Sequence, residues 1–269
     1  MVARSNRVAP TKNNVYFMGY KILVTNDDGI GSEGIKALIK ILKPLGELFV
    51  VAPSKEKSAA AHSITFNGPL KVKFLNKKTV EVEGTPTDCV MFGVYGLLNY
   101  KRPDLLVSGI NNGANLGDDI TYSGTVSAAL EGSLLGIPSI AFSLVGKTNH
   151  KYYSASKFIK NLCKFVIKNK LPKNTFLNVN IPNLNKDEIK GVAVVKQGKR
   201  IYKDSFIREI DTNGNTYYWL RGEEPSYVKE PDTDFYAIEN NMIAVTPLHF
   251  DLTNYSQLKC LKTIEKIKI

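Results

Sequence analysis

The feature that most constrains the fold is a short apolar run, residues 22–25, that leads into the acid pair Asp27 and Asp28. Four consecutive apolar or β-branched residues predict a strand buried on both faces, as at the centre of a parallel sheet. Ser32 can then cap a helix whose apolar residues recur at helical spacing over 35–42. This strand–turn–helix order predicts an α/β fold, in which ligands bind at the carboxyl ends of the strands.

The acid pair has two interpretations. One aspartate can cap the helix or close the turn without any ligand. That interpretation accounts for only one of the two carboxylates. The negative charges of the pair would still repel each other, and a divalent cation would relieve this repulsion. We therefore expect Asp27 and Asp28 to lie at a cation site.

Two more segments follow predicted buried strands and are candidate site loops. The small, polar loop 54–63 carries Ser58 and His62, and the Gly- and Asn-rich loop 108–119 carries Asn111 and Asn115. Carboxylate, hydroxyl and carboxamide oxygens together suit Mg²⁺ or Mn²⁺ and suit zinc poorly. A lone histidine in a polar loop is either structural or a general acid for the leaving group, and both readings stay open for His62.

A phosphate cradle is expected at Ser123-Gly124-Thr125, which opens a helix of small residues. Free N–H groups at a helix N-terminus and the two hydroxyls suit an oxyanion, and Gly124 lets the backbone approach it closely. Serine and threonine are also common helix caps, so the motif alone is a weak signal.

The remaining chain predicts three regions. We expect a disordered basic tail over 1–17, a Rossmann-like catalytic core over 18–182, and a C-terminal arm and oligomerisation region over 183–269. Within the core, 70–74 and 79–82 predict an edge hairpin, Thr85-Pro86-Thr87-Asp88 opens a helix, and 151–169 forms another. Strand-like pieces around 191–195 and 216–220, with a turn at Asn213-Gly214-Asn215, predict a hairpin arm that packs on a second copy of the chain.

Composition narrows the class of protein. The formal charge of +11 comes mostly from lysines scattered along the chain, without a basic block interleaved with aromatics, so we expect no specific nucleic-acid partner. No apolar run is long enough to span a bilayer, and no membrane partner is expected. The three cysteines are far apart and form no CxxC pair, which favours a reducing cytoplasm over a disulfide framework.

Several segments in the same order resemble the SurE survival-protein family of metal-dependent 5'/3'-nucleotidases. They cover most of the chain after Met18 and are far more specific together than any single motif. The segments are ILVTNDDGI (22–30), VVAPSKEKSAAAHSI (50–64), EGTPTDCV (83–90), SGINNGANLGDDITYSGTVSAALEG (108–132) and AVTPLHFDLT (244–253).

The resemblance implies a Rossmann-like core with an arm exchanged between subunits of a homodimer or homotetramer. It also implies one Mg²⁺ or Mn²⁺ per subunit and hydrolysis of nucleoside 5'- and 3'-monophosphates, with some members also acting on short polyphosphate. The chain departs from the family in its basic tail and in Ala61, where glycine is frequent. The implied metal ligands are Asp27, Asp28, Ser58 and Asn111, and the implied phosphate contacts are Ser123, Gly124 and Thr125.

Some alternatives stay open at this stage. Water or one of the two aspartates can be the nucleophile, the latter through an aspartyl-phosphate. A phosphoacceptor signalling module also carries an acid pair after its first strand, but it needs a further aspartate at the end of its middle strand. Here Asp104 precedes the strand at 105–107. A nucleic-acid-binding protein is supported by charge alone and would show a steep salt dependence of binding.

Overall fold

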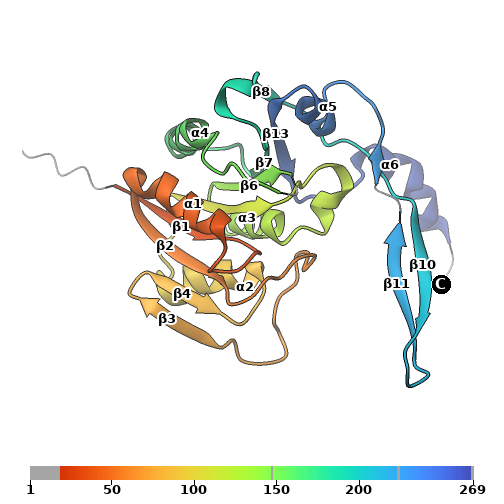
Figure 1. Ribbon diagram of the computed structural model, residues 1–269. Coiled ribbons are helices and arrows are strands. Elements are labelled where there is room, and N and C mark those ends of the chain that lie inside the picture. The colour runs from red at the N-terminus through yellow and green to blue at the C-terminus, as the bar shows by residue number, and fades with distance from the viewer. Residues whose placement is uncertain (1–18, 147, 223–224, 268–269) are drawn as a thin grey trace, which may run out of the picture.

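A computed structural model describes residues 19–146, 148–222 and 225–267. The predicted tail, 1–17, lies outside the described residues. Within them, the chain builds one large, mostly parallel sheet covered by helices on both faces (Figure 1). This confirms the α/β prediction.

The central sheet of the described chain has nine strands in the order β3-β4-β2-β1-β5-β6-β7-β13-β8. Its neighbours pair in parallel except for β3 with β4 and β7 with β13, which are antiparallel. The strands are β1 (Tyr20–Thr25), β2 (Gly46–Pro53), β3 (Val72–Asn76), β4 (Thr79–Val82), β5 (Leu105–Asn112), β6 (Ser139–Val145), β7 (Thr175–Pro182), β8 (Gly191–Val194) and β13 (Met242–His249).

The α-helices of the described chain are α1 (Glu33–Leu42), α2 (Pro86–Phe92), α3 (Gly124–Leu134), α4 (Ser156–Asn169), α5 (Asp234–Glu239) and α6 (Tyr255–Leu261). Four of them cover the faces of the sheet: α1 and α4 pack with one face, and α2 and α3 pack with the other (Figure 1). Among the described residues, no helix is long and apolar enough to cross a membrane.

Strand β1 lies at the centre of this arrangement. Ile22 and Val24 belong to the core under α1 and α4, whereas Leu23 belongs to the core under α2 and α3. All three side chains are fully buried, and each such burial stabilises the fold by about 1.5–3 kcal/mol. The strand is therefore buried on both faces, as the apolar run predicts.

Local signals also placed other elements correctly. The Ser32 hydroxyl caps α1 by accepting from the Ile35 N–H, and Thr85 and Asp88 form a complete capping box on α2. The predicted edge hairpin is β3 and β4, paired antiparallel at one end of the sheet. The predicted helix at 151–169 begins only at Ser156, because the preceding residues form turns.

The sheet continues past residue 182, where the catalytic core was expected to end. β13 pairs with β7, and β8 pairs with β13, so both strands complete the central sheet. The piece at 191–195 therefore belongs to the sheet and not to the hairpin arm.

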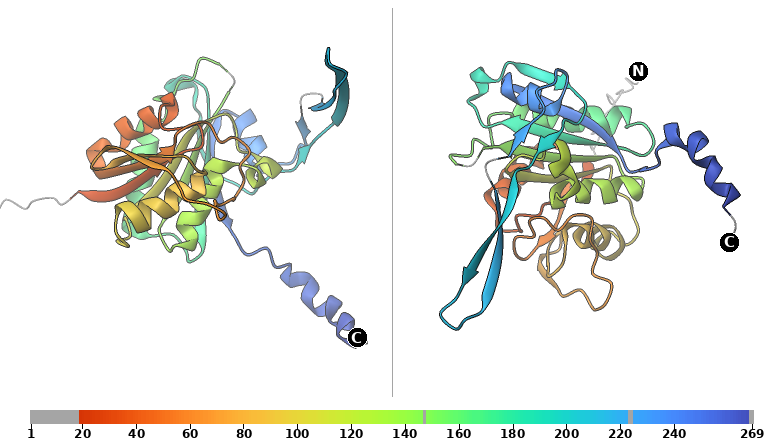
Figure 2. Two further views of the ribbon diagram at one scale, coloured as in Figure 1. Left: turned by 90° about the horizontal axis from the view of Figure 1, so that it is seen from below. Right: turned by 90° about the vertical axis from the view of Figure 1, so that its right-hand side faces the viewer.

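The projecting arm is a hairpin of β10 (Asp204–Ile210) and β11 (Thr216–Gly222), joined across the expected Asn213-Gly214-Asn215 turn. Figure 2 shows that the hairpin stands away from the core, and that the C-terminal segment that carries α6 does so too. Several of its large apolar side chains are exposed in the single chain, namely Phe206, Ile207, Ile210, Tyr217, Tyr218, Trp219 and Leu220.

Candidate active site

The acid pair lies at the point where the strand order of the sheet reverses. β1 pairs with β2 on one side and with β5 on the other, and both neighbours run parallel to it. Their carboxyl ends therefore meet at one edge, where ligands of open α/β sheets bind. Asp27 is 4% exposed there, and Asp28 is partly exposed.

Asp27 is held by the N-terminus of α3. The Thr125 N–H donates to Asp27 Oδ2 at 3.1 Å, and the Thr125 hydroxyl donates to Asp27 Oδ1. Burial raises the pKa of Asp27, while these two hydrogen bonds oppose the rise. Both carboxylate oxygens are thus fixed in orientation by one residue.

Asp28 turns toward the opposite side, where its Oδ2 accepts from the Asn112 N–H at 3.2 Å. Burial, followed by the neighbouring charge of Asp27, raises the pKa of Asp28 to about 6, and Glu56 adds to the rise. Among the described residues no donor contacts Asp28 Oδ1. An oxygen without a donor beside a second carboxylate suits a cation better than a cap.

Ser58 lies in the loop after β2, which is tied to the acid pair through its backbone. The Lys57 N–H donates to the Asp27 carbonyl at 2.8 Å, and the Ser58 hydroxyl donates to Glu56. A hydroxyl that donates its hydrogen keeps lone pairs for a cation. Ser58 itself is exposed.

His62, farther along this loop, contacts α3. Its Nε2 lies 2.9 Å from Glu131 Oε2, and the Ala61 N–H donates to the Tyr122 carbonyl at 3.1 Å. Glu131 is about 10 Å along the helix axis from Gly124, at 1.5 Å per residue. The contact supports an anchoring role for His62.

The two asparagines of the predicted loop have different surroundings. Strand β5 extends to Asn112, so Asn111 lies at its end, and its Nδ2 donates to the Gly113 carbonyl at 3.1 Å. That bond leaves the Asn111 oxygen available to a cation. Asn115 is buried, and its Nδ2 donates to Ser143 Oγ at 2.8 Å.

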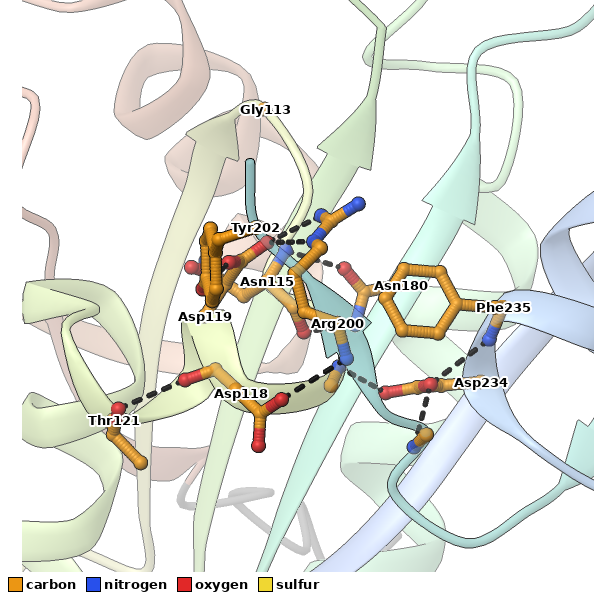
Figure 3. Close-up of polar contacts among 12 residues, drawn as sticks. Gly113, Asn115, Asp118, Asp119, Thr121, Asn180, Arg200, Tyr202, Asp234 and Phe235 are labelled. Atoms are coloured by element: carbon orange, nitrogen blue, oxygen red, sulfur yellow. Dashed lines mark hydrogen bonds and ion pairs between the residues drawn. The ribbon is translucent and has the colours of Figure 1, made fainter. Parts of the chain in front are cut away.

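The backbone of Asn115 is also fixed, because its N–H donates to Asn180 Oδ1 at 2.9 Å and its carbonyl accepts from the amides of Asn178 and Asn180. Asn115 therefore joins the loop to β6 and β7 (Figure 3).

The predicted phosphate cradle is partly occupied by contacts within the protein. Ser123 caps α3, because its Oγ accepts from the Val126 N–H at 3.1 Å. Thr125 uses both of its donors on Asp27, so the donors that find no partner within the described part of the chain are the Ser123 hydroxyl and the Gly124 N–H. A Cβ on Gly124 would lie 2.9 Å from Asp27 Cβ and 3.0 Å from Pro86 Cγ. The glycine thus serves the approach of α3 to Asp27, where we expected it to face the anion.

The donor set fits a hard divalent cation. No group of three His, Cys, Asp or Glu side chains within the described ranges could hold a metal. The expected set contains only two carboxylates and takes its other oxygens from Ser58 and Asn111, and such a mixture suits Mg²⁺ or Mn²⁺. The unpartnered Asp28 oxygen and the mutual repulsion of the two aspartates are the structural features that fit an ion there.

A polar cluster fixes the segment between Asn115 and α3 (Figure 3). The Arg200 guanidinium binds Asp119, its backbone N–H donates to Asp118 Oδ2 at 3.0 Å, and the Tyr202 hydroxyl also binds Asp119. Asp234 accepts from the Gly117 N–H at 2.8 Å. Because Arg200 and Tyr202 lie shortly before β10 in the chain, the base of the hairpin is joined to the segment that leads into the cradle.

Sequence reasoning missed several residues near the acid pair. Glu56 is two positions from Ser58, and its charge acts on both aspartates. Glu56 lies within the candidate loop 54–63, and its carboxylate is a signal of the site that the sequence does contain. His150 and Tyr152 also lie near Asp28. Tyr152 falls within the predicted helix 151–169, but it lies in a turn that precedes α4. Arg200 and Asp119 are far apart in sequence, and no local pattern predicts their contact.

Comparison with known proteins identifies the family of the chain. Residues 22–204 match the family described as Survival protein SurE. The 5'-nucleotidase SurE of Aquifex aeolicus is 49% identical over 244 residues, which cover 90% of this chain and 97% of that protein. The 5'-nucleotidase SurE of Pelobacter propionicus is 48% identical, with 90% and 98% covered.

A solved structure of a SurE protein has a similar fold. The crystal structure of the SurE protein from Aquifex aeolicus superposes with a TM-score of 0.83 at 48% identity, over 91% of this chain and 99% of that one. The family match, the curated relatives and the solved structure thus lead to one assignment: the chain belongs to the SurE family.

Proposed function

We propose that the chain is a divalent-cation-dependent nucleotidase that hydrolyses nucleoside 5'- and 3'-monophosphates to a nucleoside and phosphate. Relatives with nearly half of their residues identical are named 5'-nucleotidases. The observation that carries the proposal is the pair of adjacent carboxylates at the sheet edge. One is bound to the N-terminus of α3, and the other has an oxygen that meets no donor among the residues that the structure describes.

The cation would be held by Asp27, Asp28, Ser58 and Asn111. When bound, it would supply Lewis-acid polarisation of the phosphoryl oxygens. Asp27 fits the role of a fixed ligand better than that of a nucleophile, because both of its oxygens accept hydrogen bonds from Thr125. This favours attack by water over an aspartyl-phosphate formed on Asp27.

The phosphate would bind at the start of α3. The Ser123 hydroxyl and the Gly124 N–H point from a helix N-terminus, whose partial positive charge favours an anion. Preorganised donors of this kind stabilise charge that develops in a transition state without reorganising during the reaction. Thr125 contributes indirectly, by orienting Asp27.

The rival phosphoacceptor reading loses its support. Asp104 directly precedes β5, and its Oδ2 accepts from the Lys21 N–H at 2.8 Å. It is therefore at the opposite edge of the sheet from the acid pair and cannot complete an acidic site with it.

We further propose that the enzyme acts in the cytoplasm as a homodimer or homotetramer held by the hairpin β10–β11. The exposed apolar residues of the hairpin support this, because two strands alone have too little core to be stable in water. Buried Cys89 and Cys163 and exposed Cys260 are all free thiols, which fits a reducing compartment.

The test of the function is phosphate release from a panel of nucleoside 5'- and 3'-monophosphates with Mg²⁺, with Mn²⁺ and with a chelator. We expect turnover with a cation and none with the chelator. Undiminished turnover in the chelator, or no turnover of any nucleotide with either cation, would contradict the proposal.

A further inference from the structure

A cleft opens beside Asp28, on the side of the sheet away from α3. It has a volume of about 640 Å³ and lies between the start of α1 and the segment that follows β6. Asp28 contributes to its lining, and the predicted phosphate cradle does not. A substrate whose phosphate bound at the start of α3 would therefore have this space available across the acid pair.

One wall of the cleft is aromatic. The rings of His150 and Tyr152 stack with centroids 5.5 Å apart at 25°, and Tyr153 follows directly. Tyr153 is 51% exposed, and Lys40 Nζ lies 5.4 Å from its ring centroid. An accessible aromatic face of this kind can stack on a planar heterocycle.

The wall is fixed in place by Asn183, which follows β7. Its Oδ1 accepts from the Lys151 N–H at 2.8 Å, and its Nδ2 donates to the Thr148 carbonyl at 2.9 Å. Tyr152 also packs against the main core, close to Gly34 of α1. A wall held by these contacts is preformed, so binding to it would need little ordering of the chain.

The facing wall is acidic. Glu33 and Glu56 line the cleft together with Asp28, and no lysine or arginine is among the described residues that line it. Lys36, outside the lining, pairs with one oxygen of Glu33 at 2.8 Å. Carboxylates there can accept hydrogen bonds from hydroxyl groups, as they do from the ribose of bound nucleotides in other α/β folds. The same charges would repel a second phosphate. The cleft thus suits an uncharged group that carries an aromatic ring and hydroxyl donors.

We propose that this cleft is the nucleoside subsite of the enzyme, where the base stacks on Tyr153 and the ribose hydroxyls donate to Glu33 and Glu56. The inference rests on the proposed nucleotidase function and adds to it the part of the protein that recognises the leaving nucleoside. Tyr153 is accordingly a specificity residue that touches substrate without touching the reacting atoms.

The test compares a nucleoside 5'-monophosphate with ribose 5-phosphate, which lacks the base. Tyr153→Ala should lower kcat/KM for the nucleotide about tenfold or more, as is typical when a base–aromatic stack is lost, and should leave kcat/KM for ribose 5-phosphate unchanged. Equal losses on both substrates, or no loss on the nucleotide, would overturn the proposal.

Tyr100→Ala is the matched control. Tyr100 is 74% exposed and also forms an aromatic pair, with Tyr95 at 5.2 Å. It precedes β5, at the sheet edge opposite the acid pair, so its removal should alter neither substrate. Melting temperatures of both variants would show whether either has lost its fold.

Failure of the proposed nucleotidase function can be distinguished from failure of the proposed nucleoside subsite. If the wild-type protein hydrolysed neither substrate, binding of the free nucleoside would be measured by calorimetry in the wild type and in Tyr153→Ala. Nucleoside binding that Tyr153→Ala weakens about tenfold would retain the subsite without the reaction. Absence of nucleoside binding to the wild type, or equal binding to both, would overturn the subsite as well.

Discussion

Thr125→Val tests how α3 holds Asp27. The substitution keeps the shape of a fully buried side chain and removes the hydroxyl that donates to Asp27 Oδ1. The Thr125 N–H still donates to Oδ2, so one of the two hydrogen bonds to the carboxylate remains.

The expected magnitude follows from the type of bond that is lost. A hydrogen bond to a charged group contributes about 1.5–3 kcal/mol, and a buried carboxylate loses that amount when its donor is removed. Thr246→Val is the control, because Thr246 is 1% exposed and its hydroxyl has no partner among the described residues. This second substitution should be neutral or stabilising.

Two measurements check the reasoning. Denaturant unfolding in a chelator should show Thr125→Val less stable than Thr246→Val by about 1.5–3 kcal/mol. Calorimetric titration should show cation affinity lowered about 10–100-fold in Thr125→Val, as is typical for residues that orient a metal ligand. Thr125→Ser, which restores the hydroxyl, should recover most of both losses.

Two outcomes would refute this account. Equal stabilities of Thr125→Val and Thr246→Val would mean that the hydroxyl does not hold Asp27. A loss of stability with unchanged cation affinity would mean that Asp27 is not a ligand.

Three further predictions concern other parts of the molecule. With the cation removed by a chelator, the pKa of Asp28 is raised to about 6 in the folded protein, compared with about 3.9 in the unfolded chain. The protonated carboxyl therefore contributes stability that is fully present below about pH 3.9 and is lost as the pH rises through 6. Unfolding between pH 4 and 6 should therefore show a steeper fall in stability for the wild type than for Asp28→Asn, and parallel curves would argue against the raised pKa. Gly124→Val should weaken both phosphate inhibition and cation binding, since its Cβ would press on Asp27; unaltered cation affinity would contradict this contact. Because Asp204 pairs with Gly222, residues 205–221 can be replaced by a short Gly-Ser turn. This should convert the proposed oligomer to a monomer or an aggregate in light scattering, whereas a native oligomer without the arm would contradict its role.

The elements that sequence predicts well are those whose signal is local. Ser32 and Thr85 begin helices because a cap acts within one turn, and 22–25 forms a central strand because a buried strand needs little beyond its own apolar residues. The acid pair is noticeable for the same reason, since two adjacent charges at the end of such a strand need compensation.

The parts that sequence misses depend on packing between distant segments. Strand β10 was not predicted, because charged residues interrupt its apolar ones and its pairing partner is β11. Thr125 was expected to face phosphate, and only the approach of α3 to β1 shows that its hydroxyl faces Asp27. Tyr152 fits helical periodicity in sequence, yet the bonds from Asn183 hold its segment in turns beside the cleft.

The most direct test of the central claim is a metal titration by calorimetry, carried out alongside turnover, on Asp28→Asn and its control Asp104→Asn. Asp104→Asn removes the same charge at the opposite edge of the sheet and should leave cation affinity and turnover unchanged. Asp28→Asn keeps the size of the side chain and removes a charge from the acid pair, so we expect weaker cation binding and a kcat lower by at least about 10²–10³. An Asp28→Asn variant that binds the cation like the wild type and hydrolyses nucleotide at an undiminished rate would contradict the assignment of this site.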